Sequence, residues 1–178
     1  EGVYIGNTLI EPGDNTGPMS PRMVLMDPTV EIAVLETARG GILRAGLGFD
    51  QCDIGICTNV TVDHLGLKDI NTIEDMARVK SVVPESVKKN GYAILNADDD
   101  LVYKMREDLE CKVALFSMDE HNKRIKKHTA GGGIAAVFEN NYITIIKSGW
   151  KVRIEKVINI PLTYGGRAAF MIQNVLAA

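Results

Sequence analysis

The chain has 178 residues, of which 46% are hydrophobic and 24% are charged, and its formal net charge is −3. This composition excludes a disordered, collagen-like or coiled-coil protein, and the weak negative charge argues against nucleic-acid binding. No apolar run approaches the ~20 residues of a membrane helix, so we expect no membrane contact. The three cysteines form no Cys-x-x-Cys pair, which is typical of a reducing compartment, and we expect a cytoplasmic protein.

The length predicts one domain. Its first elements are a hairpin that turns at Gly6-Asn7 and a short helix from Ser20 to Met26. Because the chain opens on Glu1 and stops within a helical pattern, we also expect it to be a piece of something larger.

Two short apolar runs, residues 31–37 and 53–59, predict strands that are buried on both faces, as in a parallel sheet. Each run ends in polar residues. Ligands of open α/β sheets bind at the carboxyl ends of the strands, so these ends are the first place to look for a site.

Thr72 and Asp75 predict a capping box at the start of a helix over 72–90, with a kink at Pro84 and an end at Gly91. Lys80 falls on the apolar stripe of this helix. A buried lysine is costly unless it is paired, so Lys80 is either a functional amine or a side chain that extends to the surface.

The following segments alternate between strand and helix: a strand at 92–96, a helix at 98–109 and a strand at 112–117. This alternation predicts an α/β fold with a mostly parallel sheet. We expect an α/β core over 1–128, an antiparallel meander over 129–162 and a final helix over 163–178.

Several polar residues at the predicted strand ends could carry chemistry. Glu36 could bind a hard cation such as Mg²⁺, or it could simply cap a loop. Residues 58–66 form the densest polar cluster, in which Asp63 and His64 offer metal or phosphate ligands; the alternative is an Asx turn.

Further candidates are arginines and one asparagine. Arg39 and Arg44 flank a glycine-rich stretch and could meet an acidic substrate, or they could be solvated. Arg167 and Asn174 are seven residues apart, so they would share a face of the last helix and could meet a nucleotide base. Arg167 could equally be a surface residue near the start of that helix.

Five strings carry a resemblance to a known family. They are LETARGGILR (35–44), TNVTVDHLG (58–66), INTIEDMARVK (70–80), NGYAILNADD (90–99) and GGRAAFMIQNVLAA (165–178). Together they closely resemble the central domain of the cyanophycin synthetases, a branch of the Mur ligase superfamily. The resemblance implies a P-loop-NTPase-like sheet with flanking helices and a small antiparallel meander.

The resemblance also implies an activity, ATP-dependent ligation with Mg²⁺. The aspartate β-carboxylate of an aspartate-backbone polymer would be activated as an acyl phosphate, and arginine would then be joined to it. The full-length enzyme is expected to form a homo-oligomer.

Residue by residue, Glu36 and His64 match the Mg²⁺ ligands of the family, and Lys80 falls where Mur ligases carry a carbamylated lysine. Arg39 is expected to assist catalysis, and Thr58 and Asn59 to lie beside the γ-phosphate. Asn174, with Arg167 on the same helix, is expected near the adenine.

The Walker A motif is missing, since no Gly-Lys pair occurs in the 178 residues, and the resemblance places it upstream. We therefore expect the isolated chain to be inactive. Two alternatives stay open: another Mur-type ligase, of peptidoglycan or folylpolyglutamate synthesis, and a non-catalytic binding or oligomerisation module.

Overall fold

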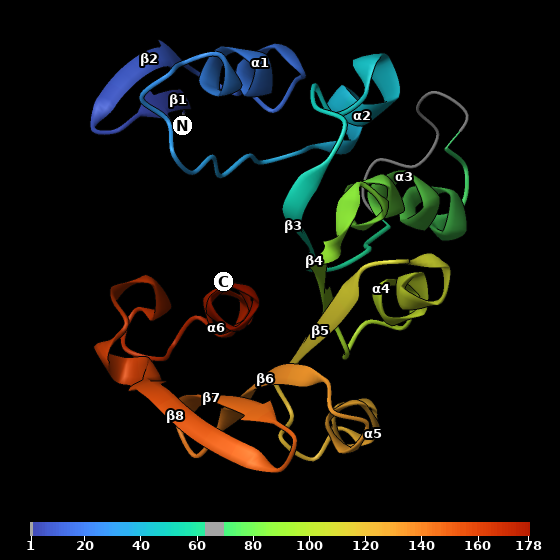
Figure 1. Ribbon diagram of the computed structural model, residues 1–178. Helices are drawn as coiled ribbons and strands as arrows, with labels where there is room; N and C mark the ends of the chain where they lie inside the picture. Colours follow the sequence, from blue (N-terminus) through green and yellow to red (C-terminus); the bar gives the residue numbers. More distant parts are fainter. Residues whose placement is uncertain (1, 63–69) are drawn as a thin grey trace.

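The computed structural model describes residues 2–62 and 70–178 and contains one six-stranded sheet (Figure 1). The strands follow one another in chain order across the sheet. They are β3 (Cys52–Cys57), β4 (Val87–Asn96), β5 (Lys112–Ser117), β6 (Ile134–Glu139), β7 (Tyr142–Lys147) and β8 (Trp150–Lys156). The pairs from β3 to β6 are parallel and those from β6 to β8 are antiparallel, which confirms the predicted mixed α/β fold.

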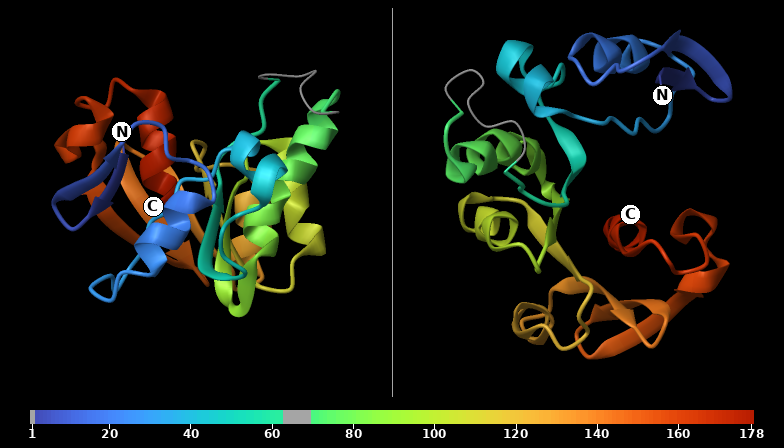
Figure 2. Two further views of the ribbon diagram at one scale, coloured as in Figure 1. Left: turned by 90° about the horizontal axis from the view of Figure 1, so that it is seen from above. Right: turned by 180° about the vertical axis from the view of Figure 1, so that it is seen from behind.

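Helices cover both faces of this sheet (Figures 1 and 2). One face carries α3 (Ile73–Glu85), α4 (Asp100–Met105) with the 3₁₀ turn η1 (Arg106–Asp108), and α5 (Lys123–Ala130). The other face carries α6 (Ala169–Ala177), preceded by the 3₁₀ turns η2 (Val157–Asn159) and η3 (Pro161–Thr163). Among the described residues, no helix is both long and apolar enough to cross a bilayer.

Alternation along the strands divides the apolar side chains between two cores. Leu95 and Leu115 belong to the larger core beside α3, α4 and α5. Phe116, the next residue along β5, belongs to the smaller core beneath α6, together with Ile172 and Leu176. A sheet that is apolar on both faces needs a helix layer on each, and this requirement explains the layered arrangement.

The N-terminal part forms a separate hairpin and two short helices. The hairpin, β1 (Gly2–Ile5) and β2 (Thr8–Pro12), turns at the predicted place. The first helix, α1 (Met19–Leu25), starts one residue before the predicted Ser20 and has no side-chain cap. The glycine-rich stretch after Ala38 is helical and forms α2 (Arg39–Ala45).

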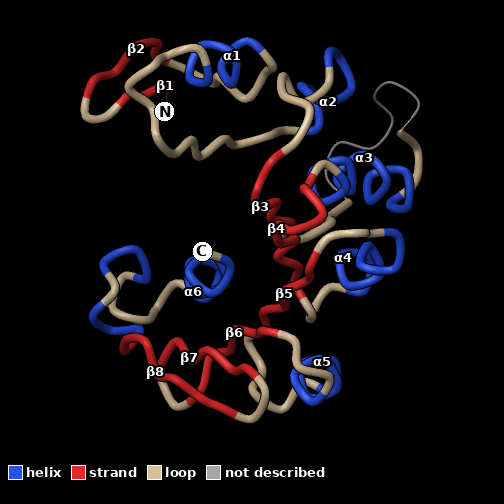
Figure 3. The backbone as a smooth tube through the Cα atoms, in the orientation of Figure 1, coloured by secondary structure: helices blue, strands red, loops and turns tan. Residues whose placement is uncertain are grey.

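The prediction of a strand over 31–37 is wrong. The segment is extended but pairs with no strand of the described structure, and Figure 3 shows it as a loop. Ile32 is 85% exposed and Val34 is 94% exposed, so the apolar character of the segment does not reflect burial here. An apolar run becomes a strand only where a neighbouring strand supplies hydrogen bonds, and none of the described strands pairs with this segment.

The predicted length of the 72–90 helix is also wrong. α3 ends at Glu85, where the Ser86 hydroxyl donates to the Val83 carbonyl at 2.7 Å, and the chain then enters β4 at Val87. Gly91 therefore lies within a strand and is not a helix cap. A Cβ atom at this position would lie 2.3 Å from the carbonyl oxygen of Asp53, so close packing against β3 requires glycine here.

Two-residue turns join the strands of the antiparallel meander. Asn140 and Asn141 join β6 to β7 with φ angles of 50° and 65°, and Ser148 and Gly149 join β7 to β8 with φ angles of 48° and 83°. Such left-handed pairs match the twist of a two-residue hairpin.

Helix α5 was not predicted, because its basic sequence has few apolar residues. Ile125, which is 1% exposed, is the main anchor of this helix in the core.

The capping box at the start of α3 gives a first prediction. The Asp75 N–H donates to the Thr72 hydroxyl at 3.1 Å, and the Thr72 N–H donates to the Asp75 carboxylate at 3.1 Å. Thr72→Ala should lower the free energy of unfolding by about 1 kcal/mol, because it leaves a helix-end N–H without its acceptor. Thr72→Ser keeps the hydroxyl and should stay close to wild type in urea denaturation. Equal stability of the two variants would contradict this assignment.

Candidate functional site

The carboxyl ends of the parallel strands β3 and β4 lie at one edge of the sheet, and polar side chains gather there. Asn96, the last residue of β4, is only 2% exposed. Its Nδ2 donates to the carbonyl oxygen of Thr58 at 2.8 Å, and its Oδ1 accepts from the N–H of Asp98 at 2.8 Å. The amide of Asn96 thus joins the loop after β3 to the loop after β4.

Asp99 makes a second connection between the same loops. Its Oδ2 accepts from the N–H of Val60 at 2.8 Å. Its Oδ1 accepts from the N–H groups of Leu101 and Val102, both at 3.0 Å, and so caps helix α4. A single carboxylate therefore holds both the loop and the start of a helix.

Lys80 reaches the same loop from helix α3. Its Nζ donates to the carbonyl oxygen of Asn59 at 2.8 Å. The Lys80 side chain is half-buried. It is therefore neither a fully buried amine nor a side chain that extends freely to the surface, the two alternatives that the sequence left open. The structure thus brings three of the predicted site residues together: Thr58, Asn59 and Lys80.

Cys57 lies directly beneath this cluster. The residue is 5% exposed, and burial raises the pKa of its thiol from the ordinary value of 9.0 to about 11. The positive charge of Lys80 lowers this pKa and the negative charge of Asp99 raises it, both by less than burial does. Both charges therefore act on the end of β3, in the interior of the protein.

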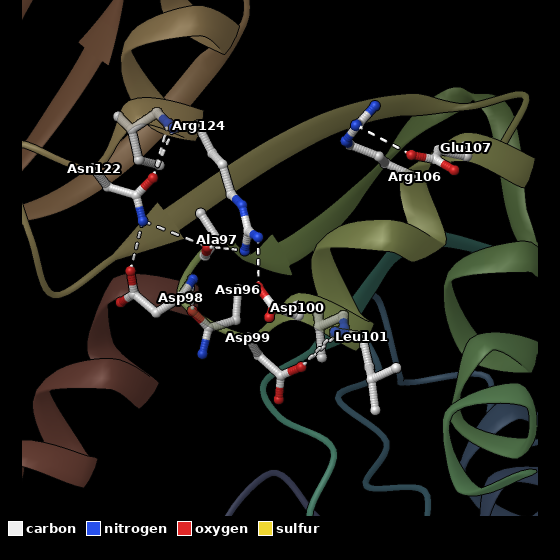
Figure 4. Close-up of polar contacts among 12 residues, drawn as sticks. Asn96, Ala97, Asp98, Asp99, Asp100, Leu101, Arg106, Glu107, Asn122 and Arg124 are labelled. Atoms are coloured by element: carbon white, nitrogen blue, oxygen red, sulfur yellow. Dashed lines mark hydrogen bonds and ion pairs between the residues drawn. The ribbon is translucent and has the colours of Figure 1, made fainter. Parts of the chain in front are cut away.

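A second polar network continues along the same edge toward β5 (Figure 4). Asp98 accepts from the Ser117 hydroxyl at 2.6 Å, from the Met118 N–H at 2.7 Å and from the Asn122 amide at 2.8 Å. Asn96 and Asp99, which hold the loop after β3, were not among the predicted site residues. The signal was available, since Asn96 ends a predicted strand and Asp99 follows it by three residues.

Arg124 closes this network on the side of helix α5. Its guanidinium donates to the carbonyl oxygen of Ala97 at 2.9 Å and to the carboxylate of Asp100 at 2.5 Å (Figure 4). It also lies over the ring of Tyr103, with 4.4 Å between the guanidinium carbon and the ring centroid. These contacts stabilise the turn that carries Asn96 and Asp99.

Glu36 belongs to the segment that precedes helix α2. It is exposed, and it borders a cavity of about 970 Å³ between the β1–β2 hairpin, α1 and residues 29–38. Lys80, Thr58 and Asn59 do not line this cavity. Arg39 begins helix α2, which packs against α3.

The residues expected near the adenine lie on the other face of the sheet, where α6 packs against β4, β5 and β6 (Figure 1). Arg167 precedes α6, so the prediction that it shares a helix face with Asn174 is wrong. Both residues are exposed, and the Asn174 amide contacts the sulfur of Met171 at 3.8 Å. His64 and Asp63 lie outside the described residues.

A Mg²⁺ ion at this site would need carboxylate ligands from the protein. Within residues 2–62 and 70–178, no group of three or more His, Cys, Asp or Glu side chains converges. Mg²⁺ is commonly held by one or two carboxylates, with water and phosphate oxygens as the other ligands. The exposed carboxylate of Glu36, beside a cavity, fits that pattern.

Comparisons with known proteins cover almost the whole chain. The family profile described as Mur ligase middle domain matches residues 14–178. Over all 178 residues, the chain is 61% identical to the cyanophycin synthetase of Crocosphaera subtropica and 56% identical to that of Nostoc sp.. It is 36% identical over 75 residues, or 41% of its length, to the UDP-N-acetylmuramate–L-alanine ligase of Clostridium acetobutylicum, of which this match covers 16%. The chain spans about a fifth of the length of the two cyanophycin synthetases.

The raised pKa of Cys57 predicts a stability that depends on pH. Between about 9 and about 11, the unfolded chain loses the thiol proton while the folded chain keeps it. Stability should therefore fall as the pH rises through this window, by roughly 3 kcal/mol in all if the shift is fully expressed. Lysines and tyrosines titrate here too, so the matched control is Cys57→Ala, measured by urea denaturation at the same pH values. The variant should show a shallower fall than wild type; parallel curves would contradict the assignment.

Proposed function

Because the chain belongs to the family of Mur ligase middle domains, we propose that it is the nucleotide-binding part of an ATP-dependent, amide-forming ligase of the cyanophycin synthetase type. The observation that carries this proposal is the identity of 61% over the whole chain. Lys80 and Asn59 meeting at the carboxyl end of β3, where α/β sheets bind ligands, also supports it.

In the proposed reaction, a carboxylate oxygen of the aspartate side chain attacks the γ-phosphorus of ATP. This gives an acyl phosphate and releases ADP. The amine of arginine then attacks the carbonyl carbon, the amide bond forms, the amine loses a proton and inorganic phosphate leaves. The acceptor is an aspartate-backbone polymer, and the complete enzyme works in the cytoplasm as a homo-oligomer.

A carboxylate and a triphosphate repel each other, so this chemistry needs positive charge near the transferred phosphoryl group. We propose that Lys80 and Arg39 act in catalysis, while Thr58 and Asn59 contact the γ-phosphate. Glu36 would hold one Mg²⁺ and His64 a second; when bound, Mg²⁺ would neutralise the phosphate charge that develops in the transition state.

Arg167 and Asn174 are proposed to contact the nucleotide base. Their place on the α6 side of the sheet separates them from Lys80, which lies on α3. A nucleotide that touches both groups would therefore extend across the carboxyl edge of the sheet. We further propose that the isolated chain does not turn over ATP, because it contains no Walker A motif.

The proposal is tested on the complete protein that contains this chain. With Mg²⁺, ATP and an aspartate-backbone primer, we expect ADP formation that depends on arginine. Lys80→Ala and Glu36→Gln should each lower kcat about 10²-fold or more, as expected when one transition-state contact is lost. Lys126→Ala, on the exposed face of α5, is the matched control and should leave kcat unchanged.

Three results would contradict parts of this proposal. ADP formation that depends on a UDP-muramoyl substrate instead of arginine would favour a peptidoglycan ligase. Robust ATP turnover by the isolated chain would overturn its proposed inactivity. An isolated chain that forms a tight oligomer in light scattering, together with a complete protein that shows no turnover, would favour a binding or oligomerisation module.

A further inference from the structure

Three consecutive residues after β3 are each held by a different element of the fold. The Thr58 carbonyl accepts from Asn96 at the end of β4, and the Val60 N–H donates to Asp99 at the start of α4. Between them, the Asn59 carbonyl accepts from Lys80 on α3. Each of these contacts is a hydrogen bond of 2.8 Å between a side chain and the backbone. We call residues 58–60, held in this way, the β3 loop.

We infer that Asn96 and Asp99 are positioning residues that fix the β3 loop and, through the Asn59 carbonyl, the amine of Lys80. The inference rests on the proposed function for the identity of the reaction. The hydrogen bonds that carry the inference do not depend on that function. Neither residue needs to touch a substrate. Their role is to hold the β3 loop. Asn59 in that loop and Lys80, which binds its carbonyl, are the residues proposed to touch the substrate.

The amide of Asn96 has one orientation available to it. Both of its ends are used, since Nδ2 donates to the Thr58 carbonyl and Oδ1 accepts from the Asp98 N–H. The side chain is 2% exposed, so water cannot replace either partner. Asn96→Asp keeps the shape and the acceptor but places a carboxylate oxygen against the Thr58 carbonyl, which should push the β3 loop away.

The two carboxylate oxygens of Asp99 bind different parts of the backbone. Oδ1 caps helix α4 and Oδ2 holds the Val60 N–H. Asp99→Asn can keep the cap, because asparagine is as good an N-cap as aspartate. The amide nitrogen would then face the Val60 N–H, so this variant should release the β3 loop while α4 stays in place.

The Val60 N–H lies in the same planar peptide group as the Asn59 carbonyl, and the Thr58 carbonyl lies in the peptide group just before it. A shift of the Thr58 carbonyl or of the Val60 N–H necessarily moves the Asn59 carbonyl, the acceptor of the lysine. A displacement of about 1 Å in a catalytic group can lower a rate by about 10²-fold. The Asn59 side chain, in contrast, is exposed, and its amide donates to the adjacent Thr58 hydroxyl at 3.4 Å.

Asp98 offers a matched control on the same turn. It accepts three hydrogen bonds, but they come from Ser117, Met118 and Asn122, on the β5 and α5 side. Asp98→Asn therefore disturbs a comparable number of hydrogen bonds on the same turn without touching the β3 loop. A merely structural role for the whole turn predicts the same outcome for all three variants.

The first test measures the accessibility of the Lys80 amine in the chain itself and needs no ligase activity. The folded chain is acetylated with acetic anhydride, and the rate at each lysine is read by mass spectrometry. Asn96→Asp and Asp99→Asn should each raise the rate at Lys80 about fivefold, the factor that matches a typical net hydrogen-bond contribution. Lys88, which is ion-paired with Asp53 at 2.8 Å, reports unfolding and should not change.

The acetylation rates decide whether Asn96 and Asp99 position Lys80. An unchanged Lys80 rate in both variants would overturn the inference. An equal rise at Lys80 in Asp98→Asn, or an equal rise at Lys88 in both positioning variants, would also overturn it, because the residues would then stabilise the fold in general.

The second test uses arginine-dependent ADP formation by the complete protein. Asn96→Asp and Asp99→Asn should lower kcat about tenfold or more and leave the KM for arginine within about twofold, while Asp98→Asn stays near wild type. If the complete protein shows no such activity, the proposed function fails while the acetylation test still decides the positioning role. If activity is present and these variants match Asp98→Asn, the positioning role fails while the proposed function stands.

Discussion

A parallel sheet leaves backbone groups without ladder partners where its strands end, and these groups must find partners elsewhere. At the carboxyl edge of β3, side chains from other elements meet this need: Asn96 and Lys80 donate to two carbonyl groups, and Asp99 accepts one N–H. The rest of the edge depends on this arrangement, since the same turn also holds β5 and α5 through Asp98 and Arg124. The need of these backbone N–H and C=O groups for partners thus determines which loop at the sheet edge is held in a fixed position.

The elements with a local signal were predictable from the sequence. The capping box of α3 and the two asparagines between β6 and β7 act through neighbours only a few residues away. The failures involve distant parts of the chain. Residues 31–37 have the composition of a strand but no strand to pair with, and α3 ends early because residues from Val87 onward pair with β3.

The residues of the candidate site also fall into those that the sequence could predict and those that it could not. Residue types and strand ends pointed to Thr58, Asn59 and Lys80, and the helical spacing of Lys80 indicated that it faces the sheet. The roles of Asn96 and Asp99 could not be derived in this way, because their partners lie 38 and 39 residues away. The separation of Arg167 from the cluster is likewise a property of the layers. The sheet lies between α3 and α6, and no sequence spacing reports that.

Strand β8 forms the far edge of the sheet, and all seven of its residues are exposed. Its apolar side chains, Trp150, Val152 and Ile154, alternate with the charged Lys151, Arg153 and Glu155. A long exposed edge of this kind is a template on which another chain could add a strand, and alternating charges are a common protection against such aggregation. Lys151 and Arg153 also contact the fold itself, through the carboxylate of Glu139 and the ring of Tyr142, so the charged positions of β8 both protect this edge and tie it to the sheet.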